Sequence, residues 1–125
     1  DSSRSPGLLP YFLSGERDSV KITMVDSLLE TAPDNPVARY LKGKALLRLD
    51  RTSESVRLLD SLDMLPLDSY LEAQRLKAQG LALYRLGRFQ AAKEKFWLSL
   101  NAVQTDAARD EVDDWIERCD WMERN

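Results

Sequence analysis

The chain has 125 residues, of which 43% are hydrophobic and 31% are charged. This balance is typical of one globular domain and excludes wholesale disorder. The formal net charge of −3 gives nucleic-acid binding no support, because phosphate recognition needs a positive surface. The sequence contains no histidine and one cysteine, Cys119, which excludes imidazole metal sites, histidine-assisted nucleophiles and an intramolecular disulfide. We therefore expect a non-catalytic domain without cofactor or metal.

The ends of the chain and its hydropathy bear on location. No segment has the roughly 20 apolar residues that a membrane-spanning helix needs, so we expect no membrane insertion. Residues 1–7 contain neither an initiator methionine nor an apolar signal core, which we interpret as the edge of a piece of a longer polypeptide. A single cysteine fits cytoplasm or periplasm, so the compartment stays open, and the excess of arginine over lysine weakly indicates a bacterial source.

The first half of the chain predicts several helices separated by proline and small polar residues. The apolar stretch 8–13 is interrupted by a proline and predicts only a short helix. Residues 18–31 predict the next helix, which ends before a proline. Asn35-Pro36 predicts an N-cap and the first position of a helix that runs to about residue 49. Either Thr52 or Ser53 is expected to cap the helix that follows.

The second half predicts three longer helices. Ser69 and the glutamate three residues later have the spacing of a capping box, and the helix that they open is expected to end at a turn formed by Gly87. The next helix is expected over residues 89–103, and the last one follows a cap at Thr105 or Asp106. Since no segment alternates apolar and polar residues as a strand would, we expect an all-α fold of six to seven helices.

An internal repeat is the strongest signal in the sequence. Residues 43–51 align with residues 80–88 at an offset of 37 residues, and six of the nine positions are identical. Small residues recur twelve positions after each glycine, and large apolar residues recur sixteen positions after it. Such spacing is typical of stacked helical hairpins.

These residues resemble the tetratricopeptide repeat, whose helix–turn–helix units stack into a right-handed α-solenoid. The signature positions are Gly43, Ser55 and Leu59 in one copy and Gly80, Ala92 and Phe96 in the next. The resemblance divides a single domain, 1–125, into a degenerate repeat (1–35), two repeats (36–68 and 69–104) and a capping helix (105–125). The degenerate repeat is carried by Gly15, Val20, Met24, Leu28 and Pro33. The first full copy departs from the family at Arg39, where a large apolar residue is usual, and at Asp50, where glycine is common.

Small residues let the two helices of a hairpin approach closely. We therefore expect Gly43 to face Ser55 and Gly80 to face Ala92. One turn away, the large apolar side chains of each hairpin are expected to fill the remaining space, pairing Leu46 with Leu59 and Leu83 with Phe96.

The last predicted helix carries one apolar face and eight acidic residues. A terminal repeat exposes apolar surface that a further helix must cover. We expect this helix to cover Trp97 and Leu100, to bury Trp115 and Cys119, and to leave its acidic residues in solvent.

A second stripe on the first helix of each hairpin is the candidate binding surface. In the tetratricopeptide family this stripe lines the concave groove that holds partner segments. Carried over by position, the groove residues are Tyr40, Lys44, Leu47, Arg48, Lys77, Leu81, Tyr84 and Arg85, with Trp115 and its neighbours Glu111 and Asp114 as a far wall. Apolar platforms with spaced cations suit a protein or peptide segment that has acidic and apolar side chains. The alternative is that the apolar members pack against neighbouring helices and the cations are only solvated.

Other partners and activities have less support. Binding of a chaperone C-terminal tail needs an asparagine where Ala78 stands. Four acidic residues share one face of the last helix, Asp110, Asp113, Asp114 and Glu117, but their pattern is that of a solvated helix and lacks the glycine of a calcium loop. The cations of residues 71–104 are scattered around two helices, which does not favour nucleic acid.

The distribution of charge keeps a structural role open. Residues 71–104 carry a charge of +4 and residues 105–125 a charge of −5. Opposed charges can pair head to tail between copies, so a segment that oligomerises or spaces its parent protein is the alternative function. Pairing between neighbouring helices of one molecule explains the same numbers.

Overall fold

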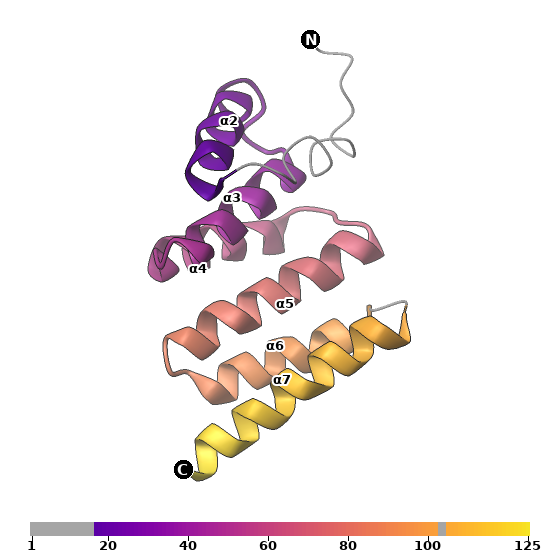
Figure 1. Ribbon diagram of the computed structural model, residues 1–125. Coiled ribbons are helices and arrows are strands. Elements are labelled where there is room, and N and C mark those ends of the chain that lie inside the picture. Colours follow the sequence, from indigo (N-terminus) through magenta and orange to yellow (C-terminus); the bar gives the residue numbers. More distant parts are fainter. Residues whose placement is uncertain (1–16, 103–104) are drawn as a thin grey trace. The chain divides into compact units, whose positions relative to one another are not determined.

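The computed structural model describes residues 17–102 and 105–125, and all regular secondary structure in these residues is helical, without strands. The helices are α2 (Asp18–Thr31), α3 (Pro36–Arg48), α4 (Thr52–Asp60), a 3₁₀-helix (Ser61–Met64), α5 (Ser69–Arg85), α6 (Phe89–Leu100) and α7 (Asp106–Arg124) (Figure 1). The all-α prediction is thus confirmed for the described part of the chain. The short helix expected at 8–13 and the signature Gly15 lie outside the described residues.

The chain divides into two compact units between Leu65 and Pro66. The boundary falls in the segment that joins the 3₁₀-helix to α5. Each unit has its own helix-packing core and is described separately below.

In the first unit, α2 packs on α3. Val25 and Ala38 are fully buried at the centre of this contact, and Lys42 of α3 forms an ion pair of 2.6 Å with Asp26 of α2. Met24, which the degenerate repeat placed at a signature position, is 43% exposed. Leu28, another of these positions, packs against the cluster of Val25 and Ala38, so the structure agrees with the expected position of Leu28 and differs from that of Met24.

The contact between α3 and α4 depends on Gly43. A Cβ atom at this position would lie only 2.8 Å from Cδ2 of Leu59, and Leu59 is fully buried. The buried Ser55 hydroxyl donates a hydrogen bond of 2.6 Å to the carbonyl oxygen of Gly43, so the predicted approach of Gly43 and Ser55 is confirmed. The large residue lies directly over the glycine, closer than the expected full turn away.

Arg39, at which the sequence departs from the tetratricopeptide pattern, is well paired in this unit. Its guanidinium donates to the carbonyl oxygen of Pro33 at 2.7 Å and to the Ser61 hydroxyl at 3.3 Å. It also pairs with Asp34 at 2.9 Å. One side chain therefore joins the loop before α3 to the 3₁₀-helix after α4.

The helix starts agree with the sequence at two positions and differ at two. The side chain of Asn35 caps α3 by accepting from the amide of Ala38 at 3.0 Å, and Thr105 caps α7. The predicted cap at Ser69 is wrong, because Asp68 accepts from the amide of Leu71 at 2.8 Å and places Ser69 inside α5. The expected cap of α4 is also wrong, because that helix begins at Thr52 without a side-chain cap.

The turns that close α3 and α5 share one backbone conformation. Asp50 has φ of 62° and Gly87 has φ of 77°, which is the left-handed region that glycine adopts most easily. The two turns therefore keep the same geometry although only one has the glycine that is common in the repeat family.

The second unit repeats the glycine contact of the first. A Cβ atom at Gly80 of α5 would lie 2.7 Å from Cε1 of Phe96 of α6, whose ring is fully buried. The hairpin is also linked by the buried Ser99 hydroxyl, which donates to the carbonyl oxygen of Ala73 at 3.2 Å. As in the first unit, the large residue covers the glycine itself, closer than the expected full turn away. Ala92, the residue expected to face Gly80, is fully buried in the same hairpin.

Helix α7 covers this hairpin as a capping helix would. Val112, Ile116 and Cys119 are buried in one cluster with Ala92 and Phe96. Trp115 and Leu100 pack against the same cluster.

The predicted burial of Trp97 is wrong, because its side chain is 49% exposed. Adjacent helical residues point about 100° apart, and Phe96 takes the direction of the core.

The acidic residues of α7 are not all in solvent as predicted. Lys93 of α6 pairs with Asp120 and with Glu123 at 2.8 Å each, and its side chain is only 13% exposed. Hydrogen bonds to these two carboxylates raise the pKa of Lys93. The ammonium group also lies over the ring of Trp97, 5.5 Å from its centroid. This lysine therefore attaches the end of α7 to α6.

Candidate functional site

The candidate binding surface is considered within each unit. In the first unit, Tyr40 and Leu47 are buried, at 7% and 5% exposure. The ammonium group of Lys44 lies 5.8 Å from the centroid of the Tyr40 ring, within the range of a cation–π contact. Arg48 is exposed. Of the four predicted residues on α3, the two cations are thus the ones that solvent reaches.

In the second unit, the predicted residues of α5 lie beside α7. Leu81 and Tyr84 are half-buried against the unit's core cluster. The Tyr84 ring contacts Phe89 and Trp115 edge to face, each with a centroid separation of 5.3 Å. Trp115 also stacks on Phe96, with centroids 6.0 Å apart. The aromatic rings therefore form a continuous row from the core to the edge of α7.

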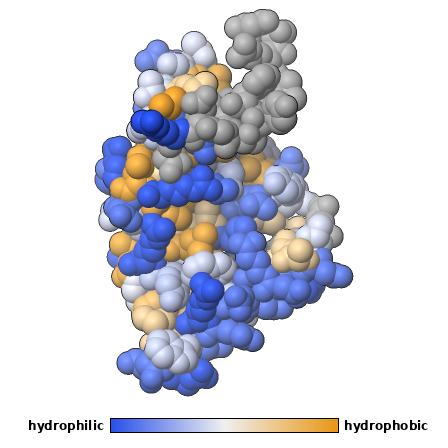
Figure 2. Space-filling model, viewed as in Figure 1, coloured by the Kyte–Doolittle hydropathy of each residue, from blue (hydrophilic) through white to orange (hydrophobic). Residues whose placement is uncertain are grey.

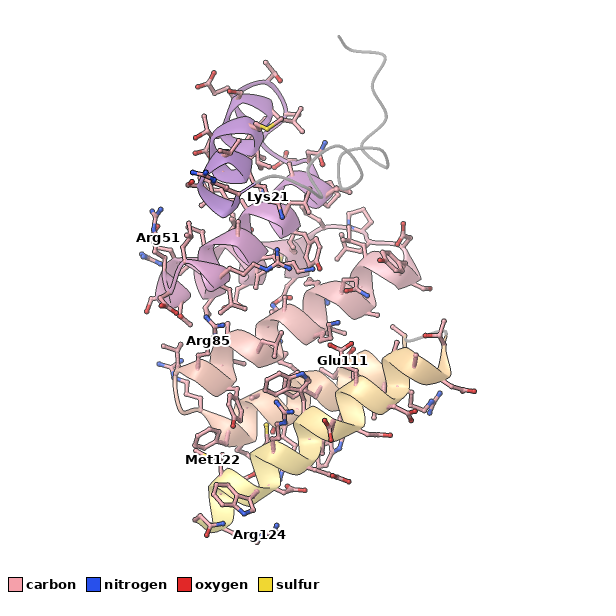
Figure 3. All side chains as sticks on the ribbon, viewed as in Figure 1. Lys21, Arg51, Arg85, Glu111, Met122 and Arg124 are labelled. Carbon is pink, nitrogen blue, oxygen red and sulfur yellow. The ribbon has the colours of Figure 1, made fainter. Side chains whose placement is uncertain are left out.

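Charged groups lie along the same edge. Figure 3 shows Glu111 extending from α7 on the side of α5, and its two carboxylate oxygens accept from the Lys77 ammonium group at 3.3 and 3.2 Å. The guanidinium carbon of Arg118 lies 4.6 Å from the centroid of the Trp115 ring, and Arg118 also pairs with Asp114 at 3.6 Å. Arg85 is exposed at the end of α5.

We call the surface formed by Lys77, Leu81, Tyr84, Glu111, Trp115 and Arg118 the α5–α7 face. Sequence reasoning found five of these residues and missed Arg118. The ion pair of Arg118 could have been predicted, since Asp114 and Arg118 have the i, i+4 spacing of a helical ion pair. The sequence does not predict that the guanidinium lies over an indole ring.

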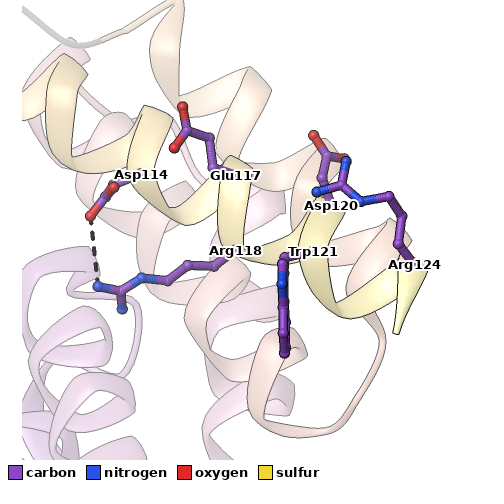
Figure 4. Close-up of a pocket in the computed structure, with 6 residues that line it drawn as sticks. All are labelled: Asp114, Glu117, Arg118, Asp120, Trp121 and Arg124. Atoms are coloured by element: carbon purple, nitrogen blue, oxygen red, sulfur yellow. Dashed lines mark ion pairs between the residues drawn. The ribbon is translucent and has the colours of Figure 1, made fainter.

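The outer side of α7 forms a second surface. Figure 2 shows that hydrophilic residues cover most of the visible surface of this helix. A surface hollow of about 390 Å³ lies here, lined by residues of α7 alone (Figure 4): Asp114, Glu117, Arg118, Asp120, Trp121 and Arg124. Trp121 is 56% exposed and was not singled out by the sequence.

Neither surface has the features of a metal centre or a reactive thiol site. Within residues 17–102 and 105–125, no three histidine, cysteine, aspartate or glutamate side chains are arranged to hold a metal ion. Cys119 is buried, and burial together with the nearby carboxylates of Glu123 and Asp120 raises its pKa. A thiol in this state is a poor nucleophile. Among the helices described, none combines the length and apolar character needed to cross a membrane.

No family model, curated protein or solved structure matches this chain.

Proposed function

We propose that the chain is a non-catalytic module that binds a protein or peptide segment, and that it is a tetratricopeptide-like solenoid. The observation that carries this proposal is the α5–α7 face. Half-buried Leu81, Tyr84 and Trp115 lie next to charged groups that are open to solvent. Aromatic anchors beside arginine and lysine are the groups that contribute most to protein interfaces.

The packing of both hairpins supports the same proposal. Gly43 lies under Leu59 in the first unit and Gly80 under Phe96 in the second, so two units of similar sequence share one rule of helix contact. Repeats of this kind pack helices into a scaffold and leave the outward stripe of the first helix for binding. On that stripe, Arg48 of α3 and Arg85 of α5 occupy corresponding positions in the two copies, and each helix carries one further cation, Lys44 or Lys77.

The test is a selection of peptides from a phage-displayed random library on the immobilised chain. The selected peptides are then measured against the variant Lys77→Glu, Arg85→Glu and Arg118→Glu, which reverses three cations of the second unit. We expect at least a tenfold loss of affinity, because the reversed charges repel the acidic side chains that the face is proposed to accept.

The matched control reverses three other exposed cations, Arg57→Glu, Arg88→Glu and Arg124→Glu, and thus changes the net charge equally. Circular dichroism checks that both variants keep their helix content. If no peptide is enriched, or if both triple variants lose affinity to the same extent, the proposed binding surface is wrong.

A further inference from the structure

The two lysines that hold α7 differ in how firmly they are paired. Lys93 is 13% exposed and contacts its two carboxylates at 2.8 Å. Lys77 is 22% exposed, Glu111 is 52% exposed, and both distances between them exceed 3.1 Å. Charge-assisted hydrogen bonds of good geometry are about 2.7–2.9 Å long. The Lys77–Glu111 ion pair is thus long and exposed to solvent, whereas the ion pairs of Lys93 are short and largely buried.

We propose that Glu111 is an internal competitor on the α5–α7 face, and that the partner segment supplies a carboxylate that replaces it on Lys77. This inference rests on the proposed function and names its partner chemistry. In the unbound chain, Glu111 satisfies the Lys77 ammonium group. A segment without a carboxylate leaves this pair intact, and a segment with one must displace Glu111.

Helix geometry sets the spacing that such a segment needs. Along α5, Leu81 lies one turn from Lys77 and Tyr84 lies two turns from it, which corresponds to about 6 Å and about 10 Å along the axis. An extended segment advances about 3.3 Å per residue. The carboxylate should therefore be two or three residues away from the apolar side chain that packs on Tyr84 and Trp115.

The local charges favour an acidic segment over a basic one. Arg118 lies over Trp115 on the same edge, with its side chain 55% exposed and a long ion pair of 3.6 Å to Asp114. Once Glu111 is displaced, Lys77 takes the incoming carboxylate. Arg118, about 10 Å further along α7, adds positive charge beside the Trp115 ring. A basic segment is repelled by both of these cations and can form ion pairs only with the exposed carboxylates between them.

The probes are two blocked peptides, acetyl-Glu-Ser-Leu-Trp-amide and the same peptide with glutamine in place of glutamate. Their dissociation constants are measured by NMR titration of the ¹⁵N-labelled chain in about 0.15 M salt, where long-range charge effects are screened. We expect Glu111→Gln to bind the glutamate peptide about twofold to fivefold more tightly than the unchanged chain does, which is the range for an exposed ion pair. The glutamine peptide should bind both proteins equally.

Glu117→Gln is the matched control, because it removes the same charge from an exposed position on the same helix. This variant should bind the glutamate peptide and the glutamine peptide with the same affinities as the unchanged chain does. Lys77→Gln should abolish the preference for the glutamate peptide. If Glu111→Gln disturbs the helix content, Glu111→Ala serves as a second variant.

Two kinds of result overturn the proposal. In the first, Glu111→Gln fails to tighten binding of the glutamate peptide, or Glu117→Gln tightens it equally. In the second, neither blocked peptide binds, or a lysine peptide of the same design binds better. If peptides from the random library still bind through Lys77 and Arg85 in that case, the proposed function stands and only the acidic partner is excluded.

Discussion

Replacement of Gly80 by alanine or leucine tests the closest helix contact in the second unit. An alanine Cβ would lie 2.7, 2.8 and 2.9 Å from three carbon atoms of the Phe96 ring, where about 3.5–4.0 Å is the favourable separation. The ring is fully buried and packs against Trp115 with centroids 6.0 Å apart, so it cannot move aside without disturbing the core under α7.

Two opposing terms determine the size of the effect. Alanine is about 0.8–1.0 kcal/mol more favourable than glycine within a helix, and overpacking a core costs about 1–3 kcal/mol. We therefore expect Gly80→Ala to destabilise the chain by up to about 2 kcal/mol. Gly80→Leu adds three more carbon atoms at the same point, and its cost should exceed that of alanine by several kcal/mol, a large part of the 5–15 kcal/mol typical of a domain.

The assay is urea denaturation followed by circular dichroism and by tryptophan fluorescence, since agreement of the two signals is needed to assign one free energy. The double variant Gly80→Ala with Phe96→Leu provides the control, because leucine is the residue that covers the glycine of the first unit. Removal of the ring should recover part of the loss, as a coupling energy between the two positions. If Gly80→Ala raises stability by the full helix-propensity amount, or if the coupling is zero, the close contact is refuted.

Three further outcomes are expected. Ser55→Ala should lower the free energy of unfolding by about 0.5–1.5 kcal/mol in urea denaturation, because it removes the hydrogen bond to the Gly43 carbonyl. The control Ser53→Ala, on the exposed side of α4, should lower it little. Equal effects of the two variants would contradict the role of the buried hydroxyl. Burial raises the pKa of Cys119, so its thiol stays neutral in the folded chain. The folded state should therefore lose stability as pH rises past the ordinary thiol pKa of about 8.5, where the unfolded chain loses this proton. A free energy of unfolding that is constant from pH 7 to 10 would argue against this. Light scattering at low and moderate salt should show a monomer, and a dimer that dissociates as salt rises would favour self-association through charge.

The helix positions were predictable because their signals are local. Asn35 before Pro36 determines the start of α3, and the bounds of α2 agree with the expected 18–31. The cap of α5 was placed one residue late, because aspartate and serine are about equally good caps and Asp68 directly precedes Ser69. Which of two adjacent capping residues is used depends on the path of the loop before the helix. The sequence of the helix does not determine that path.

The core was predictable in its members and less so in its geometry. Spacing alone identified the glycines and the large residues sixteen positions later. It did not show that Phe96 covers Gly80 directly, or that Trp97 stays half exposed beside Lys93. These outcomes depend on how each pair of helices is rotated about its axes, which is decided by the best packing of both surfaces together. The contacts of Lys93 with α7 were missed for the same reason, since they join residues 27 and 30 positions apart.

The positive charges of residues 71–104 and the negative charges of residues 105–125 partly pair within one molecule. Three carboxylates of α7 pair with two lysines of the preceding hairpin: Glu111 with Lys77, and Asp120 and Glu123 with Lys93. A second copy of the chain therefore finds fewer available cations than the composition suggests, and a head-to-tail contact through charge would first have to break these pairs. Breaking the Lys93 pairs would leave a largely buried ammonium group without its carboxylates, which is costly. The Lys77 pair is the one that can open at low cost, and this difference is what makes the α5–α7 face the better candidate for an exchange of partners.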